Sequence, residues 1–311
     1  MRIVFMGTPA AAVPSLQALI SGGHEIVAVW TRPDKPSGRG HKVTPSPVKE
    51  LAISQGLTVH QPAKIKTPES VSLFTSHNAD LVVVVAYGRI LPSQFLNAPK
   101  KGCVNVHFSL LPKYRGAAPV NWAVINGEST TGVTTMFIEE ELDAGPILLQ
   151  RATPIGITET APELMTQLSQ MGAELLRETV DQLDTITPRP QPRRDASFAP
   201  ILRKEDGSID WTGSARAIEC RVRGLQPWPN AFTHYKRERL IVWKAEDAED
   251  KRGAAAPGEA VLAHGDDLIV RCGAETSLRL IEVQLEGKRR MSARDFLNGT
   301  HLKVGERFES A

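Results

Sequence analysis

The sequence has 311 residues, with 37 lysines and arginines against 35 aspartates and glutamates, which gives a formal net charge of +2. At about 100–200 residues per domain, this length predicts two folded domains. Hydrophobic residues make up 41% and charged residues 23%, as in an ordinary globular protein. The balanced charge excludes bulk attraction to nucleic acid, so any such contact must come from local basic patches.

The first half of the chain alternates strand and helix patterns. We expect strands at residues 2–6, 25–30, 59–60, 80–86, 103–107 and 132–138. We expect helices at residues 10–21, 47–56 and 161–184. Segment 80–86 is apolar on both faces, which is typical of the middle of a parallel sheet. Residues 1–184 are therefore predicted to form a doubly wound, Rossmann-like α/β domain.

The composition changes after this domain. Residues 185–200 contain four prolines and no apolar period, so we predict an ordered or semi-extended linker at 185–204. Short strand patterns separated by turns then follow at 231–236, 239–244, 259–263, 267–272 and 277–285. Evenly spaced short strands predict that residues 205–311 form a small β-barrel resembling an OB fold.

The cysteines and the apolar runs indicate the compartment. Cys103, Cys220 and Cys272 are odd in number and widely spaced, so we expect neither a disulfide framework nor a metal site. The N-terminus lacks the regions of a signal peptide, and no apolar run approaches the ~20 residues that span a bilayer. The sequence therefore predicts a cytoplasmic protein without membrane contact.

A glycine-containing turn, Gly7-Thr8-Pro9-Ala10, follows the first strand. It lacks the second and third glycines of the G-x-G-x-x-G pattern that brings a backbone close to a dinucleotide pyrophosphate. The chain also contains no phosphate-binding G-x-x-x-x-G-K-[ST] motif. These absences argue against a nucleotide-dependent oxidoreductase and favour a plain strand-to-helix turn.

Two polar residues, Asn105 and His107, end the strand pattern at 103–107. Their spacing points both side chains to one face of the strand, near the carboxyl end where open α/β sheets bind ligands. The acidic loop 139–146 includes Asp143, whose carboxylate is able to orient a histidine and favour its cationic form. Asn and His together are able to donate hydrogen bonds to a carbonyl oxygen that develops negative charge.

By itself the N-x-H pair leaves a structural interpretation open, in which His107 is a satisfied core histidine and Asn105 a turn partner. No serine or cysteine lies in a G-x-S-x-G nucleophile elbow, and Cys103 on the same strand has the character of a small core residue. The lack of a protein nucleophile favours direct attack by the substrate, without a covalent intermediate.

A basic loop occupies residues 31–42. It carries one acidic residue, Asp34, and the four cations Arg32, Lys35, Arg39 and Lys42. Its glycines and prolines predict irregular structure, and its charge suits a phosphate backbone. A solvated surface loop is the alternative. Further cations that would extend such a surface are Arg189, Arg193, Arg194, Lys288, Arg289 and Arg290.

A long ordered string then carries a family resemblance. The run NVHFSLLPKYRGAAP at 105–119, followed by Leu142-Asp143-Ala144-Gly145, resembles the folate-dependent formyltransferases. The opening RIVFMGTP and the segments at 31–40, 45–49 and 296–299 resemble a tRNA-modifying branch of that family, so the resemblance covers nearly the full length. Phe108 departs from the family's usual glycine, and we expect it to change packing beside the folate loop.

The resemblance implies a donor, an acceptor and residue roles. The donor is 10-formyltetrahydrofolate, and the acceptor is the α-amine of methionine esterified to initiator tRNA. The reaction would therefore serve translation initiation. Asn105 and His107 stabilise the oxyanion of a tetrahedral intermediate, and Asp143 orients and tunes His107. The loop Ser109-Leu110-Leu111-Pro112 contacts the folate. The resemblance further implies that the 31–42 loop binds the acceptor stem, with Arg39 as the best-placed cation. It also implies that the C-terminal barrel holds tRNA and that the enzyme is a monomer without metal.

Two alternatives use the same residues differently. A formyltransferase for a small amine, such as a ribonucleotide or an amino sugar, would share the catalytic residues but has no use for the basic loop or the second domain. A non-catalytic RNA-binding protein would have no use for Asn105 and His107 in the sheet crevice. Both remain open from the residues alone.

Overall fold

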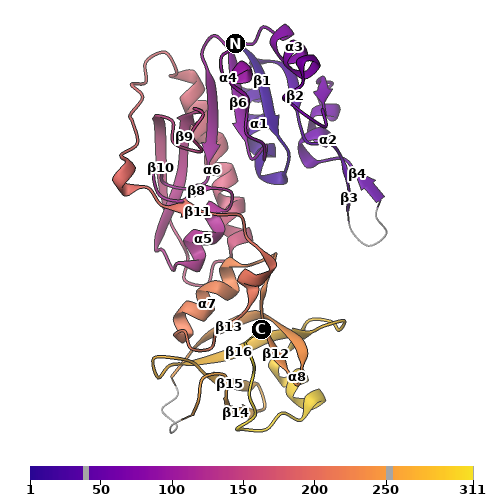
Figure 1. The fold of residues 1–311 in the computed structure, drawn as a ribbon, viewed down its shortest axis with the longest axis vertical. Helices are drawn as coiled ribbons and strands as arrows, with labels where there is room; N and C mark the ends of the chain where they lie inside the picture. The colour runs from indigo at the N-terminus through magenta and orange to yellow at the C-terminus, as the bar shows by residue number, and fades with distance from the viewer. Residues whose placement is uncertain (38–41, 250–254, 311) are drawn as a thin grey trace. The chain divides into compact units, whose positions relative to one another are not determined.

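The structure, a computed structural model, describes residues 1–37, 42–249 and 255–310. Two compact units account for the chain (Figure 1). The N-terminal unit comprises Met1–Pro119, Thr130–Pro154 and Met165–Pro200. The C-terminal unit comprises Val120–Ser129, Ile155–Leu164 and Ile201–Ala311. Two ten-residue segments that precede residue 165 thus cluster with the C-terminal unit.

A seven-stranded sheet organises the N-terminal unit, with the strand order β10-β9-β7-β6-β1-β2-β5. The bounds are Arg2–Gly7 for β1, Glu25–Trp30 for β2, Val59–His60 for β5, Leu81–Val85 for β6, Cys103–His107 for β7, Thr130–Phe137 for β9 and Ile147–Pro154 for β10. Strands β5, β2, β1, β6 and β7 run parallel, whereas β9 and β10 are antiparallel to their neighbours. The predicted doubly wound α/β fold is confirmed, and β10 is an additional strand.

Helices cover both faces of this sheet. They are α1 (Val13–Ser21, after a 3₁₀ turn at Ala10–Ala12), α2 (Pro47–Ser54), α3 (Pro68–Ser76), α4 (Ser93–Leu96) and α6 (Ala161–Asp181). Helix α5 (Pro119–Ile125) clusters with the C-terminal unit from Val120 onward. Helix α2 begins where the pattern predicts, because the Ser46 side chain accepts a hydrogen bond from the backbone of Lys49 and a proline follows the cap. Helix α3 begins in the same way at Thr67.

The alternation of side chains along the strands assigns each helix to a face. Cys103 of β7 belongs to the buried cluster that contains Phe74 of α3 and Phe95 of α4, whose rings stack at 3.7 Å. Val106 points the other way, and its methyl group would lie 3.0 Å from a Cβ placed on Gly172 of α6. Residues 105 and 107 therefore share the α3 and α4 face of the sheet, and α6 packs on the opposite face.

Two small sheets correct the sequence interpretation. Strands β3 (Lys35–Ser37) and β4 (Lys42–Thr44) pair as an antiparallel hairpin that projects from the N-terminal unit in Figure 1. The prediction that the 31–42 loop lacks regular structure is wrong for Lys35–Ser37 and for Lys42. These residues lie on the two strands, whose backbones form hydrogen bonds with each other. Strand β8 (Arg115–Gly116) pairs with β11 (Phe198–Ala199), which ties the proline-rich segment to the N-terminal unit.

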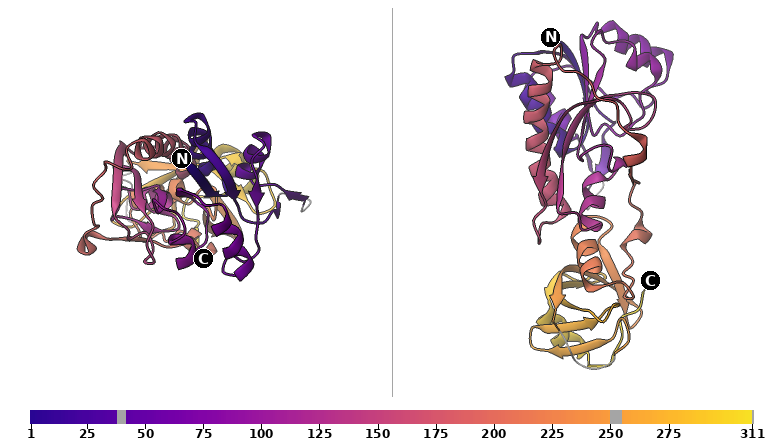
Figure 2. Two further views of the ribbon diagram at one scale, coloured as in Figure 1. Left: turned by 90° about the horizontal axis from the view of Figure 1, so that it is seen from above. Right: turned by 90° about the vertical axis from the view of Figure 1, so that its left-hand side faces the viewer.

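The C-terminal unit is built on an antiparallel six-stranded sheet with the order β12-β13-β16-β15-β14 and β17 beside β16 (Figure 2). The bounds are Ala231–Tyr235 for β12, Glu238–Ala248 for β13, Ala260–His264 for β14, Asp267–Arg271 for β15, Ser277–Leu285 for β16 and Met291–Ser292 for β17. Helices α7 (Ala215–Gly224) and α8 (Ala293–Thr300) complete it, with short 3₁₀ turns at Arg193–Asp195 and Lys204–Gly207 elsewhere in the chain.

The end of the chain closes this sheet. Glu309 forms a bridge with His234 of β12, and Arg307 forms one with Glu259, immediately before β14. The two edges of the sheet are thus joined through one short segment, which removes exposed edges and produces a barrel. The predicted β-barrel class is confirmed.

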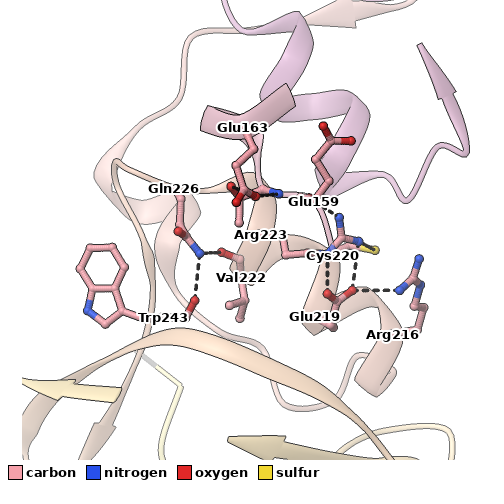
Figure 3. Close-up of polar contacts among 10 residues, drawn as sticks. Glu159, Glu163, Arg216, Glu219, Cys220, Val222, Arg223, Gln226 and Trp243 are labelled. Carbon is pink, nitrogen blue, oxygen red and sulfur yellow. Dashed lines mark hydrogen bonds and ion pairs between the residues drawn. The ribbon is translucent and has the colours of Figure 1, made fainter. Parts of the chain in front are cut away.

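A buried ion pair fixes helix α7 inside the C-terminal unit (Figure 3). Arg223 binds both carboxylate oxygens of Glu219 and donates to the carbonyl of Glu159 at 2.7 Å. Both charged side chains are less than 10% exposed. They line a cavity of about 540 Å³ whose wall also contains Trp243. No helix of the described chain is long and apolar enough to cross a membrane.

Candidate active site

His107 lies at the carboxyl end of β7 and is 5% exposed. Its Nε2 atom lies 2.9 Å from the carbonyl oxygen of Tyr114. Because a carbonyl only accepts, Nε2 carries the hydrogen and donates it. Its Nδ1 atom faces Asp143, at 3.8 Å from Oδ2. With Nε2 donating to Tyr114, Nδ1 is able to donate a hydrogen bond only when the ring carries a second proton.

Asp143 lies in the loop between β9 and β10, and its side chain is 13% exposed. Its Oδ2 accepts a 2.8 Å hydrogen bond from the backbone N–H of Gly116, so one oxygen is shared between this amide and the His107 ring. The backbone of Asp143 has φ = 49°, in the left-handed region. Short polar residues such as aspartate tolerate this conformation better than other side chains do.

Asn105 precedes His107 by two residues and lies between Val84 of β6 and Met136 of β9. The side chain is partly exposed, and it makes no hydrogen bond to any part of the chain that the structure describes. Its amide hydrogens are consequently available to a ligand at the same edge of the sheet as His107.

The loop after β7 is held tightly by its own hydrogen bonds. The hydroxyl of Ser109 donates to the carbonyl of Lys113 at 2.6 Å, and the side chain is fully buried. The hydroxyl of Thr134 donates to Ser109 and accepts from the backbone of Leu111. The Leu111–Pro112 peptide is cis. Leu110 and Pro112 are partly exposed, whereas Ser109 and Leu111 are buried.

Comparison with known proteins identifies the family. Residues 1–180 match the formyl transferase domain, and residues 201–301 match the formyl transferase C-terminal domain. The chain belongs to the formyl transferase family. It is therefore an enzyme of the formyl-transferring class.

Close relatives cover both units. The methionyl-tRNA formyltransferase of Citrifermentans bemidjiense is 49% identical over 98% of this chain and 95% of its own. That of Caldanaerobacter subterraneus is 48% identical over 98% of this chain and 99% of its own. Among solved structures, an N-formyltransferase from Helicobacter canadensis, in complex with folinic acid and dTDP-3-aminofucose, superimposes with a TM-score of 0.66. It is 17% identical and covers 89% of this chain and 98% of its own, so it supports the fold alone.

The predicted cations of the basic loop lie on different elements, as far as the structure describes them. Arg32 lies immediately after β2, where its Nη1 atom would contact a Cβ placed on Gly88 at 3.4 Å. Lys35 is exposed on β3, and Lys42 begins β4. Arg39 lies outside the described residues. The structure therefore places Arg32 at the sheet edge rather than in the hairpin.

The acidic residue of this loop is neutralised within the unit. Asp34 accepts hydrogen bonds from Lys49 of α2 at 2.5 Å and from Gln61 at 2.8 Å. The bond from Lys49 is the main reason why the pKa of Asp34 lies below its ordinary value. The charge of Asp34 is thus paired with a lysine of α2 rather than with a cation of the loop.

Phe108 is buried, and its ring would lie 3.3 Å from a Cβ placed on Gly172 of α6. It thus fills the space beside the smallest residue of that helix, on the face opposite to Asn105 and His107. The expected effect of Phe108 on packing beside the 109–112 loop stays a prediction.

Sequence reasoning missed four residues at this edge of the sheet. Tyr87 is 1% exposed, and its hydroxyl has no partner among the described residues. Arg115, Glu141 and Gln191 form a connected polar cluster beside Asp143. Arg115 could have been found, because it is a charged residue within the KYRG segment. Nothing in the proline-rich segment distinguished Gln191 from its neighbours.

Proposed function

We propose that this enzyme transfers the formyl group of 10-formyltetrahydrofolate to the α-amine of methionine esterified to initiator tRNA. The observation that carries the proposal is the full-length similarity to methionyl-tRNA formyltransferases, with identities of 45–49% over at least 98% of this chain. The similarity spans both units of the chain.

The arrangement of polar groups supports direct transfer. In our proposal the amine nitrogen attacks the formyl carbon, the bond from that carbon to N10 of the folate breaks, and N10 receives a proton. The Asn105 amide and protonated Nδ1 of His107 donate to the formyl oxygen as negative charge develops on it. Asp143 orients the His107 ring and accepts the amine proton, directly or through water. An α-amine with a pKa of about 7.7–8.0 is sufficiently neutral near pH 7–8 to attack.

The loop 109–112 is proposed to contact the folate donor. Its hydrogen bonds to Thr134 and Lys113 fix one backbone shape, which suits the binding of a rigid ring system. The Tyr87 hydroxyl has no partner among the described residues, and the side-chain amide of Asn105 is free. Both groups are able to form hydrogen bonds with a bound ligand.

We propose that tRNA is held by Arg32, Lys35, Arg39 and Lys42 together with the barrel. In this proposal residues 1–184 form the catalytic domain, 185–204 the linker, and 205–311 the tRNA-binding domain of a monomeric cytoplasmic enzyme. The cations of the 31–42 loop and the barrel class, which commonly carries nucleic-acid surfaces, support this assignment.

Formyl transfer from 10-formyltetrahydrofolate to methionyl initiator tRNA, measured beside a methionine ester without tRNA, tests the proposal. We expect a strong preference for the charged tRNA. Transfer to small amines with charged tRNA ignored would move the function to the small-acceptor alternative. Specific tRNA binding without transfer to any acceptor would favour the non-catalytic alternative.

Replacing Arg39 with alanine is expected to lower kcat/KM for charged tRNA and to reduce the slope of log affinity against log salt by about one phosphate contact. Kinetics with the methionine ester should stay unchanged, since that acceptor has no phosphate backbone. The matched control is Lys66→Ala, which removes an exposed cation from outside the loop. Equal salt slopes for wild type and Arg39→Ala would remove Arg39 from the tRNA contact.

A further inference from the structure

The proline-rich segment 185–200 is bound along the N-terminal unit. Arg189 exchanges two backbone hydrogen bonds with Ile147 at the start of β10, each 2.8 Å long. Phe198 and Ala199 form β11 against β8. Between these anchors lies Gln191, which is 8% exposed. A buried amide in a connecting segment indicates a specific task, because its polar atoms must find partners inside the protein.

Both polar atoms of the Gln191 side chain find hydrogen-bond partners at the candidate active site. Its Nε2 atom donates to the carbonyl of Asp143 at 2.9 Å and to that of Gly145 at 2.8 Å. Its Oε1 atom accepts from Nε of Arg115 at 3.0 Å. Arg115 is 3% exposed and also binds Glu141, at 3.2 Å. One side chain thus joins the loop that carries Asp143 to the segment after β7.

The loop has physical reasons to need this support. The backbone of Asp143 has φ = 49°, a left-handed conformation that a residue with a Cβ adopts less readily than glycine does. Gly145 approaches Phe137 so closely that a Cβ would lie 1.9 Å from its carbonyl oxygen. The separation of 3.8 Å between Asp143 and the His107 ring persists only while this loop keeps its shape. The two amide donations fix the peptide carbonyls on each side of Ala144.

We propose that Gln191 is a positioning residue for formyl transfer, which holds the carboxylate of Asp143 beside Nδ1 of His107. The inference rests on the proposed function, because it assigns Gln191 to the reaction that Asp143 is proposed to serve. It makes the proline-rich segment a part of the catalytic unit. Gln191 itself need not touch either substrate.

Two variants separate positioning from simple loss of stability. Gln191→Met keeps the length of the side chain and removes all three hydrogen bonds. Gln191→Glu keeps an acceptor for Arg115, and so keeps that buried cation paired, but replaces the donor with an oxygen that repels two carbonyls. If Gln191→Met fails to fold, Gln191→Glu still tests the proposal.

The matched control is Gln226→Met in the C-terminal unit. Gln226 donates to two backbone carbonyls, Val222 at 3.1 Å and Trp243 at 2.9 Å, which Figure 3 shows as dashed lines. This variant loses the same kind of bonds from a partly buried glutamine. We expect it to keep the kcat of the wild-type enzyme for the methionine ester.

The experiment combines amide hydrogen exchange of full-length protein with transfer kinetics. We expect both Gln191 variants to exchange faster in peptides covering residues 139–146, and to lower kcat about 10²-fold while KM for either substrate changes little. That loss corresponds to a misplacement of about 1 Å at a reacting group. The Gln226 variant should change neither quantity.

Exchange at 139–146 that equals wild type in both Gln191 variants would overturn the proposal, whatever the enzyme's substrate. Faster exchange with unchanged kcat would also overturn it, by reducing Gln191 to a structural role. Failure of the proposed function is a separate outcome, recognised by wild-type enzyme that transfers no formyl group to any acceptor. The exchange measurement still decides whether Gln191 holds the loop in that case.

Discussion

Alanine at position 107 is expected to lower kcat for formyl transfer by about 10²–10³-fold, the usual cost of removing one donor from an oxyanion site. His107 is the group whose Nδ1 faces Asp143, and its other nitrogen is committed to Tyr114. The protonated ring therefore has one donor for the formyl oxygen, and alanine removes it. Single-turnover kinetics with charged tRNA measure the effect on the chemical step.

Asn105→Ala is the companion variant, with an expected loss of the same order, because its amide is free to donate at the same edge of the sheet. The control is His77→Ala in the same unit, whose imidazole accepts from Trp30 at 3.4 Å. Trp30 lies on β2, which β1 and β6 separate from β7. Near-normal kcat in His107→Ala or Asn105→Ala would exclude that residue from oxyanion stabilisation. Weaker tRNA binding with unchanged kcat would instead assign the residue to the binding of the acceptor.

The second large effect concerns stability. Glu219→Ala is expected to destabilise the C-terminal unit by about 3–5 kcal/mol, the range measured when one partner of a buried ion pair is removed. Arg223 would keep its charge in a site where its side chain is 8% exposed. Its remaining bond to Glu159 does not neutralise that charge. The loss therefore exceeds what the missing methylene groups alone would cause.

Urea unfolding followed by hydrogen exchange of C-terminal peptides measures this change, because a chain with two units is not assumed to unfold in one step. The control is Glu25→Ala, which removes the exposed partner of Arg2, and we expect it to cost no more than about 1 kcal/mol. A loss for Glu219→Ala as small as for this control would show that Arg223 finds another anion or water. The double variant Glu219→Ala with Arg223→Met should recover part of the stability.

Local patterns predicted much of the fold. Segment 80–86 was identified as a central strand because it is apolar on both faces, and β6 is buried at each of its five positions. Strand β10 was missed, since its apolar pattern is interrupted by the partly exposed polar residues Gln150 and Arg151. The hairpin β3–β4 was missed for a related reason. Its glycines and prolines indicate a turn, but pairing between its flanks depends on register rather than composition.

The sequence by itself determined the strand that carries Asn105 and His107, because a period of two residues places both side chains on one face. The string that includes Asp143 determined the family. Only the tertiary structure decided what surrounds them. Gln191 lies 48 residues beyond Asp143 in a segment that resembles a spacer, and its hydrogen bonds appear only when that segment folds back. The barrel likewise closes through the last residues of the chain, with Glu309 bonded to β12. Such contacts depend on distance in space, which periodicity and composition do not encode.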